Sequence, residues 1–288
     1  MAGKRLILFL GVVCGSSAAL LVRASTAPSI VLVVYRMALT VLLLTPALLR
    51  GKDDLRNLDR RTLALCALSG VALGLHFALY FSAVRRTSLA ACGILVDMEV
   101  LFVAFASVLI LHKKLSAKAW AAILIALTGA ILIGLGDVGS GAGDLTGDAM
   151  AFLAAACMGA YTMLGSVCRR RITTVTYTYI VYAMAALTTL VLSLAGGTPL
   201  FGYGSVNLLT ALGLAVFCTL LSHSVFSWAL RYLSAPFVST ALLLDGVCAA
   251  LWGVILYGER PGALVIVGAV LTIAGIAFYT RIREEETV

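Results

Sequence analysis

The chain has 288 residues, of which 62% are apolar and 12% are charged, with a formal net charge of +8. Soluble domains carry about 25% charged residues, so this composition excludes a water-soluble enzyme. The Lys and Arg residues lie between apolar runs and are not gathered on one face, so nucleic acid is not an expected partner.

The first apolar run begins after Lys4 and Arg5 and continues to about residue 23. A secretory signal has an apolar core of about 7–15 residues and a cleavage site made of small residues. Here a large residue, Val13, precedes Cys14, and further apolar runs follow. We therefore expect a first helix that stays in the membrane.

Charges and turn residues divide the chain into ten apolar segments, each long enough to cross a bilayer as a helix of roughly 20 residues. Ten such spans use about 200 residues, which leaves no room for a folded soluble domain. Pro46 lies inside the second segment and predicts a mild bend. The predicted fold class is an all-α integral membrane protein with ten transmembrane helices, at residues 5–23, 28–49, 62–84, 87–111, 117–136, 149–168, 172–195, 206–230, 234–257 and 261–280.

The distribution of Lys and Arg predicts the orientation, because positive residues gather in the cytoplasmic loops of membrane proteins. With the N-terminus in the cytoplasm, Arg36 falls within a span and all but four of the other basic residues fall on the cytoplasmic side. We therefore expect a multi-pass protein of the inner or plasma membrane with both termini in the cytoplasm. The four exceptions are Arg23, Arg85, Arg86 and Arg260.

The second half of the chain repeats the first at an offset of 146 residues. The offset pairs Ala83 with Ala229, Arg85 with Arg231, Ser88 with Ser234, Glu99 with Asp245, Ala104 with Ala250, Val108 with Val254, Lys114 with Arg260 and Gly129 with Gly275. Each copy holds five spans, an odd number, so the second copy enters the membrane from the opposite side, as in the inverted repeats of secondary transporters. We predict a first repeat at residues 1–136, an outer connecting loop at 137–148, and a second repeat with a short cytoplasmic tail at 149–288.

Five short motifs follow one another along the chain, namely Cys14-Gly15-Ser16-Ser17, Tyr35-Arg36, Glu99 followed by Lys113-Lys114-Leu115, Asp245-Gly246, and Gly258-Glu259-Arg260-Pro261. In this order they resemble the EamA-domain family of the drug/metabolite transporter superfamily, over essentially the whole chain. The first motif is similar to a Trp-Gly-Ser-Asn in the family, the second to its aromatic-Arg pair, the fourth to its Glu-Pro and the fifth to its Gly-Glu-Arg. The resemblance implies a ten-helix carrier that exports small metabolites, amino acids or drugs.

Three acidic residues lie near the middle of predicted spans, Asp97 and Glu99 in the fourth and Asp245 in the ninth. A central Asp costs roughly 2.5–3.5 kcal/mol on an insertion scale, so such residues are rarely idle. Glu99 and Asp245 are equivalent in the two repeats, and we predict that they bind a proton or a cationic group of the substrate. Asp97 lies about 200° from Glu99 around the helix, so the two do not line one cavity equally. The alternative is that protonated acids only join helices through hydrogen bonds.

Arg36 and a set of polar and aromatic residues are further candidates for the substrate site. Arg36 either neutralises a buried carboxylate or binds an anionic group; if it shares a cavity with an acid, an amino-acid zwitterion fits. Aromatic rings and imidazoles at helical spacing bind cations or relay protons, but they also serve as plain packing. The GxxxG spacings at 11–15 and 70–74 predict close helix approach. The other candidates are His76 and Tyr80 in the third span, His223, Ser224 and Trp228 in the eighth, and Ser16 and Ser17 in the first.

The sequence thus predicts a secondary active transporter that exports a small metabolite, such as an amino acid or a related amphipathic or cationic compound, by alternating access. The expected partners are this substrate, a proton as the candidate coupling ion, and the lipid bilayer, and the protein is expected as a monomer or homodimer. No enzymatic activity or cofactor is expected. No metal site is expected either, because the seven cysteines are scattered singly with no paired spacing.

Two other functions fit parts of the sequence. A uniporter or channel-like pathway for a small organic cation would use the same acids, and saturable, gradient-coupled flux would distinguish a carrier from it. The string Gly134-Leu135-Gly136-Asp137 matches the GxGD of intramembrane aspartyl proteases, but such an enzyme needs two aspartates that face each other. Asp137 falls at the outer end of its span, and the chain has no Tyr-Asp partner motif.

Overall fold

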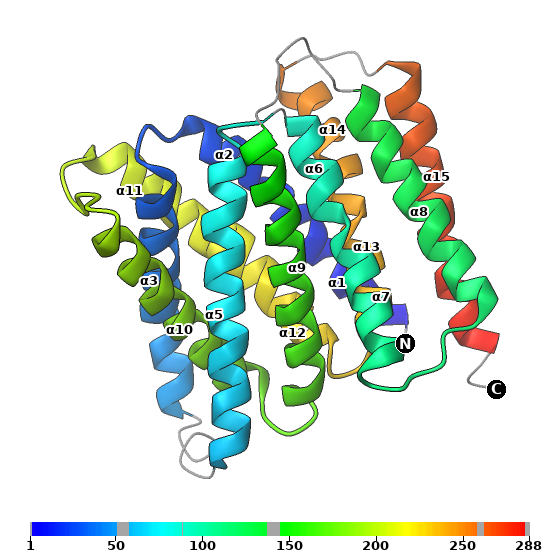
Figure 1. The fold of residues 1–288 in the computed structure, drawn as a ribbon, viewed down its shortest axis with the longest axis horizontal. Coiled ribbons are helices and arrows are strands. Elements are labelled where there is room, and N and C mark those ends of the chain that lie inside the picture. Colours follow the sequence, from blue (N-terminus) through cyan, green and yellow to red (C-terminus); the bar gives the residue numbers. More distant parts are fainter. Residues whose placement is uncertain (1, 51–57, 88, 137–144, 258–261, 286–288) are drawn as a thin grey trace.

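The computed structural model describes residues 2–50, 58–87, 89–136, 145–257 and 262–285, and this part of the chain is built from helices alone (Figure 1). The first half contains α1 (Ala2–Gly15), α2 (Ala18–Ala24), α3 (Ser29–Arg50), α5 (Arg60–Ala83), α6 (Leu89–Asp97), α7 (Glu99–Leu109) and α8 (Ala117–Gly136). The second half contains α9 (Leu145–Cys168), α10 (Thr174–Ala195), α11 (Gly204–Gly213), the π-helix η1 (Leu214–His223), α12 (Ser224–Ala229), α13 (Ala235–Leu242), α14 (Leu244–Tyr257) and α15 (Ala263–Glu285).

Each of the ten predicted segments is largely helical over its described residues, and Pro46 lies inside α3 as expected. The protein is therefore an all-helical, multi-pass membrane protein in the part that the structure describes. Six helical stretches are long and apolar enough to cross a bilayer, namely Gly3–Val22, Ser29–Arg50, Arg60–Ala83, Leu145–Cys168, Thr174–Ala195 and Gly204–Ala229. Shorter apolar helices lie at Ala117–Leu132, Ala235–Cys248 and Ala263–Tyr279.

Three predicted segments are interrupted where the sequence analysis expected continuous helices. The segment at 5–23 breaks at Ser16 and Ser17, the segment at 87–111 breaks at Met98, and the segment at 234–257 breaks at Leu243. The Ser16 and Ser17 hydroxyls each donate 2.8 Å hydrogen bonds to the carbonyl three residues earlier, and such bonds compete with helical backbone bonding. At Met98 and Leu243 the backbone N–H also bonds three residues back, so each break is a single tightened turn.

The cap of α5 is formed by Asp59, outside the apolar span. Its carboxylate accepts a 3.1 Å hydrogen bond from the Thr62 backbone N–H, and hydrogen bonding from Thr62 lowers the pKa of Asp59. A carboxyl whose pKa is depressed on folding stabilises the folded state above its unfolded pKa of about 3.9 and loses that effect as the pH falls. We expect an Asp59→Ala variant to expose the first turn of α5 to faster amide exchange at pH 7. The difference from wild type should shrink as the pH falls below the unfolded pKa of about 3.9, and a pH-independent difference would contradict this account.

Glycines allow close helix approach, as the GxxxG spacings predicted. A Cβ added at Gly70 would lie 2.5 Å from the Val181 carbonyl oxygen of α10, and one at Gly74 would lie 3.1 Å from the Ala185 oxygen. A Cβ at Gly11 would lie 2.9 Å from Val225 of α12. These contacts confirm the prediction of close approach.

A Gly70→Ala substitution is expected to destabilise the protein by about 1–3 kcal/mol, because the backbone of α10 must move to admit the methyl group. The matched control is Gly93→Ala in α6, where an added Cβ meets nothing within 4 Å. Thermal unfolding of both purified variants in one detergent checks this prediction. Equal unfolding temperatures for the two would show that α5 and α10 are less tightly packed than the structure indicates.

The helices α8 and α15 make a self-complementary contact. Gly129 of α8 approaches the backbone of Gly268 and Thr272, and Gly275 of α15 approaches the backbone of Ala126. The 146-residue offset relates Ala126 to Thr272 and Gly129 to Gly275. Gly129 thus meets Thr272, and their equivalents in the other half, Gly275 and Ala126, meet each other in the same way. Such a reciprocal contact is the pattern of a two-fold interface.

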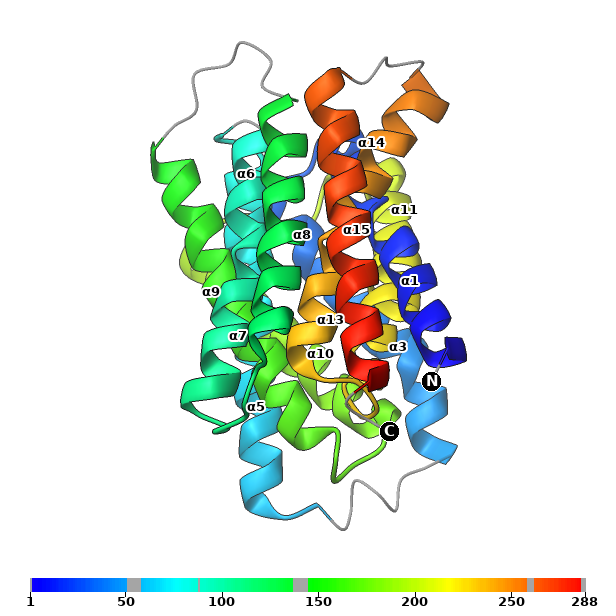
Figure 2. The ribbon, with the colours of Figure 1, turned by 90° about the vertical axis from the view of Figure 1, so that its right-hand side faces the viewer.

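The two ends of the molecule differ in packing. The start of α1 and the end of α15 lie toward one end, called here the terminal end (Figure 2). Toward that end α7 packs against α13 (Figure 1). Toward the opposite end lie α6 and α14, and among the described residues these two helices form no comparable packed pair. An apolar cluster that includes Val103 of α7 and Phe237 of α13 fills the contact between these two helices.

Candidate functional site

Arg36 of α3 is buried in the middle of the helix bundle, with 1% of its surface exposed. Its Nε donates a 2.7 Å hydrogen bond to Thr219 Oγ1, and its Nη2 donates a 3.0 Å bond to the Cys218 carbonyl. The guanidinium also lies 4.1 Å from the centre of the Phe77 ring. No ion pair to a carboxylate is found in the described part of the chain. Arg36 therefore ties α3 to η1 and neutralises no acid directly.

The π-helix η1 provides the acceptors for Arg36. Thr219 Oγ1 donates 3.1 Å to the carbonyl of Leu214, five residues earlier, and the Ser224 N–H bonds the Thr219 carbonyl at the same spacing. A π-helix carries an extra residue per turn and frequently marks a functional site. The wider turn leaves the Cys218 carbonyl available to the guanidinium.

Histidines and aromatic rings surround Arg36. His76 is buried, its Nδ1 lies 2.9 Å from the Ala154 carbonyl, and its ring is stacked on Tyr80 at 5.8 Å. His223 meets Phe77 edge-on at 5.1 Å, and its buried Nδ1 has no hydrogen-bond partner. Phe77 thus joins Arg36 to both histidines. The structure brings together four sequence-predicted candidates from α3, α5 and η1.

Asp97 and Asp245 lie at the two helix breaks, Asp97 as the last residue of α6 and Asp245 in the first turn of α14. Both side chains are half-buried, and among the described residues neither makes a hydrogen bond or an ion pair. They lie close enough for their charges to interact, and both act electrostatically on Tyr80. We call Arg36, Tyr80, Asp97, Ser222 and Asp245 the central cluster.

Ser222 belongs to the central cluster through Gly15. A Cβ built on Gly15 would lie 2.5 Å from Ser222 Oγ and 3.9 Å from Asp245 Oδ1, so both oxygens flank the same bare Cα. Ser222 is 1% exposed, and its hydroxyl has no hydrogen-bond partner among the residues that the structure describes. A buried polar group without a partner is rare, so this hydroxyl points to a group that the chain itself does not provide.

Glu99 is placed differently from Asp245, although the two are equivalent in the repeat. Glu99 is buried, and its Oε1 accepts a 2.9 Å hydrogen bond from Thr162 of α9. Asp97, two residues earlier, is the first-half acid whose charge acts on Asp245. Asp97 and Glu99 thus face different neighbours, as their angular separation predicted.

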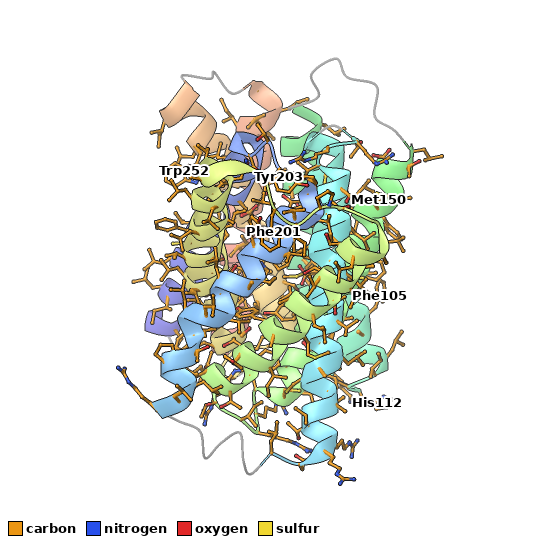
Figure 3. The ribbon with its side chains drawn as sticks, turned by 90° about the vertical axis from the view of Figure 1, so that its left-hand side faces the viewer. Phe105, His112, Met150, Phe201, Tyr203 and Trp252 are labelled. Atoms are coloured by element: carbon orange, nitrogen blue, oxygen red, sulfur yellow. The ribbon has the colours of Figure 1, made fainter. Side chains whose placement is uncertain are left out.

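The remaining candidates lie around the central cluster or away from it. Trp252 of α14 donates 2.8 Å to Ser16 Oγ, and Ser17 Oγ lies 3.4 Å from the Cys218 sulfur. The Trp228 ring lies 5.2 Å from the Tyr232 ring in a tilted arrangement, and both side chains pack against the apolar cluster that contains Phe237. Figure 3 shows Trp252 toward the opposite end and His112 toward the terminal end.

Sequence reasoning missed several residues that the structure places at the site. Tyr182 hydrogen-bonds Ser224 at 3.0 Å, and Tyr161 hydrogen-bonds Ser227 at 2.8 Å. The 146-residue offset could have indicated three of the missed residues, because each is the equivalent, in the other repeat, of a candidate that the sequence did predict. The pairs are Ser16 with Thr162, Arg36 with Tyr182, and His76 with Ser222.

The comparisons with known proteins agree with this arrangement. The model of the EamA-like transporter family matches the chain twice, over residues 3–135 and 145–281. The chain belongs to the EamA-like transporter family. This membership confirms the resemblance found in the sequence and identifies a membrane transporter.

Solved structures support the fold of this EamA-like protein. A structure described as "Crystal structure of protein" covers 100% of this chain and 100% of its own, with a TM-score of 0.83 and 18% identity. At that identity the likeness shows the fold alone. No curated protein matches the chain. The GxGD string, the Gly258–Pro261 motif and residues 137–144 of the predicted outer loop fall on or run into residues outside those that the structure describes, whereas residues 145–148 of that predicted loop form the first turn of α9.

Proposed function

We propose that this EamA-like transporter is a secondary carrier that moves a small metabolite out of the cell by alternating access, through a path between two five-helix halves. The observation that carries the proposal is the pair of broken helices. Both breaks, at Met98 and Leu243, stand beside half-buried acids, and α7 and α13 pack at the terminal end while α6 and α14 do not pack at the other.

The packing pattern supports two inverted repeats, at residues 1–136 and 149–288, and ten membrane-spanning helices. The self-complementary contact between α8 and α15 is what a two-fold axis between the halves produces. Other packed pairs also obey this symmetry, in which α1 is equivalent to α9, α3 to α10 and α5 to η1. The contact of α5 with α9 is matched by the contact of η1 with α1, and α3 contacts its own equivalent, α10. Met98 and Leu243 also share one backbone conformation, with φ of −59° in both.

The difference between the two ends supports a gate. With α7 and α13 in contact, and no comparable contact between the described residues of α6 and α14, the path would be closed at the terminal end. Rocking one half against the other would separate α7 from α13 and bring α6 toward α14. The central cluster would then be open to the terminal end and closed to the opposite end. Both termini are proposed to be cytoplasmic, as the Lys and Arg distribution predicts, so this conformation faces outward.

The test is counterflow in proteoliposomes that hold the purified full-length protein. Liposomes are loaded with unlabelled compounds from a panel of amino acids, amines and carboxylates, and the uptake of the labelled compound is followed with and without a pH gradient. A carrier shows transient accumulation against the label gradient, whereas a channel or uniform leak does not. Absence of counterflow for every compound would refute the proposal. A dependence on the pH gradient would support proton coupling.

A further inference from the structure

We infer that the central cluster binds a small organic cation with two amino groups between Asp97 and Asp245. This inference rests on the proposed transport function and names the class of compound that is carried. It replaces the zwitterion considered from the sequence, because the structure gives Arg36 a different role.

The two carboxylates are available to a ligand. Asp97 and Asp245 are half-buried and close enough to interact, and neither has a hydrogen bond or an ion pair among the described residues. Two like charges at membrane depth are costly, and the cost is relieved by protonation of one acid or by a cation between them. Arg36 does not supply that cation, because its guanidinium is held by Thr219 and Cys218 and lies against Phe77.

Ser222 is the second, independent observation. Its buried hydroxyl lacks a partner and flanks the bare Cα of Gly15 together with Asp245 Oδ1. An ammonium group carries three donors, which can be shared between a carboxylate and a hydroxyl oxygen. One amino group between Asp245 and Ser222 would satisfy both acceptors, and the second would lie at Asp97.

The remaining wall of the cluster also favours a cation. Tyr80 is half-buried, stacks on His76 with one face of its ring, and lies within electrostatic range of both acids. Aromatic faces attract ammonium groups. A carboxylate on the ligand would be repelled by Asp97 and Asp245, and the Arg36 guanidinium that could attract it is buried and held against Phe77 by its two bonds to η1.

The experiment measures equilibrium binding of four compounds with the same four-carbon chain to the purified protein by calorimetry. The compounds are 1,4-diaminobutane, 1-aminobutane, 4-aminobutanoate and butanedioate. We expect 1,4-diaminobutane to bind at least about tenfold more tightly than 1-aminobutane, and the two carboxylates to show no binding. Preferential binding of either carboxylate, or no binding of any compound, would overturn the inference.

Variants locate the site. Asp97→Asn and Asp245→Asn should each weaken 1,4-diaminobutane binding by at least about tenfold. Ser222→Ala removes only an unbonded hydroxyl, so it should preserve the fold and weaken both amines about threefold. The matched control is Asp148→Asn, since Asp148 accepts a 2.6 Å bond from Thr87 away from the cluster, and it should leave the affinity unchanged. Unchanged affinity in Asp97→Asn and Asp245→Asn would overturn the inference.

The failure of this inference is distinguishable from the failure of the proposed function. If counterflow is observed for another class of compound while 1,4-diaminobutane does not bind, only the substrate class is wrong. If 1,4-diaminobutane binds but no compound shows counterflow, the site stands and the carrier mechanism is wrong.

Discussion

An Arg36→Lys variant is expected to lower the free energy of unfolding by about 3–5 kcal/mol, more than the change to an apolar residue, because it leaves a buried charge without its partners. Lysine keeps the charge but presents a compact ammonium in place of a planar fork. It cannot reach Thr219 Oγ1 and the Cys218 carbonyl together while lying flat against Phe77. The conservative exchange is therefore the more damaging one.

The companion variant is Arg36→Met, which removes the charge and keeps much of the volume. It gives up two hydrogen bonds, about 1.5–3 kcal/mol each when charged, but it also removes the cost of burying an unpaired guanidinium. We expect a smaller loss of stability and a complete loss of transport, since α3 is no longer tied to η1. Thermal unfolding in one detergent and counterflow check both variants. If Arg36→Lys is as stable as wild type, Arg36 does not hold η1 as described.

The helical segments could be predicted from the sequence because long apolar runs between charges leave few alternatives in a bilayer. The breaks at Met98 and Leu243 could not, because no proline or glycine occupies either position. They arise where tertiary packing favours a tightened turn. The breaks at Ser16 and Ser17 carried a signal, since serine hydroxyls bond the preceding turn.

The sequence predicted candidate residues but not their partners. It placed Arg36 and three acids inside apolar segments, and in the structure these residues lie in α3, α6, α7 and α14. It paired Glu99 with Asp245 by symmetry, whereas the structure places Thr162 against Glu99 and Asp97 near Asp245. Such pairing depends on how α6, α9 and α14 are rotated against one another, which a single sequence does not encode locally. The π-helix depends equally on tertiary contacts.

A Gly15→Ala variant is expected to reduce transport by at least about tenfold while the protein stays folded. The new methyl group would lie 2.5 Å from Ser222 Oγ and 3.9 Å from Asp245 Oδ1, so it would occupy the space between the two acceptors. The Ser222 side chain can rotate away, which limits the damage to the fold. Loss of one hydrogen bond to a charged group costs about 1.5–3 kcal/mol, or about 10–100-fold.

The matched control is Gly11→Ala, one turn earlier on the same helix. Its methyl group would crowd Val225 at 2.9 Å but would lie a full turn from the Gly15 position beside Asp245. Both substitutions gain about 1 kcal/mol of helix propensity and lose some of it to crowding, so their unfolding temperatures should be similar. Only Gly15→Ala should lose transport. Equal transport by the two variants would show that the face of α1 beside Asp245 is packing surface and that the substrate passes elsewhere.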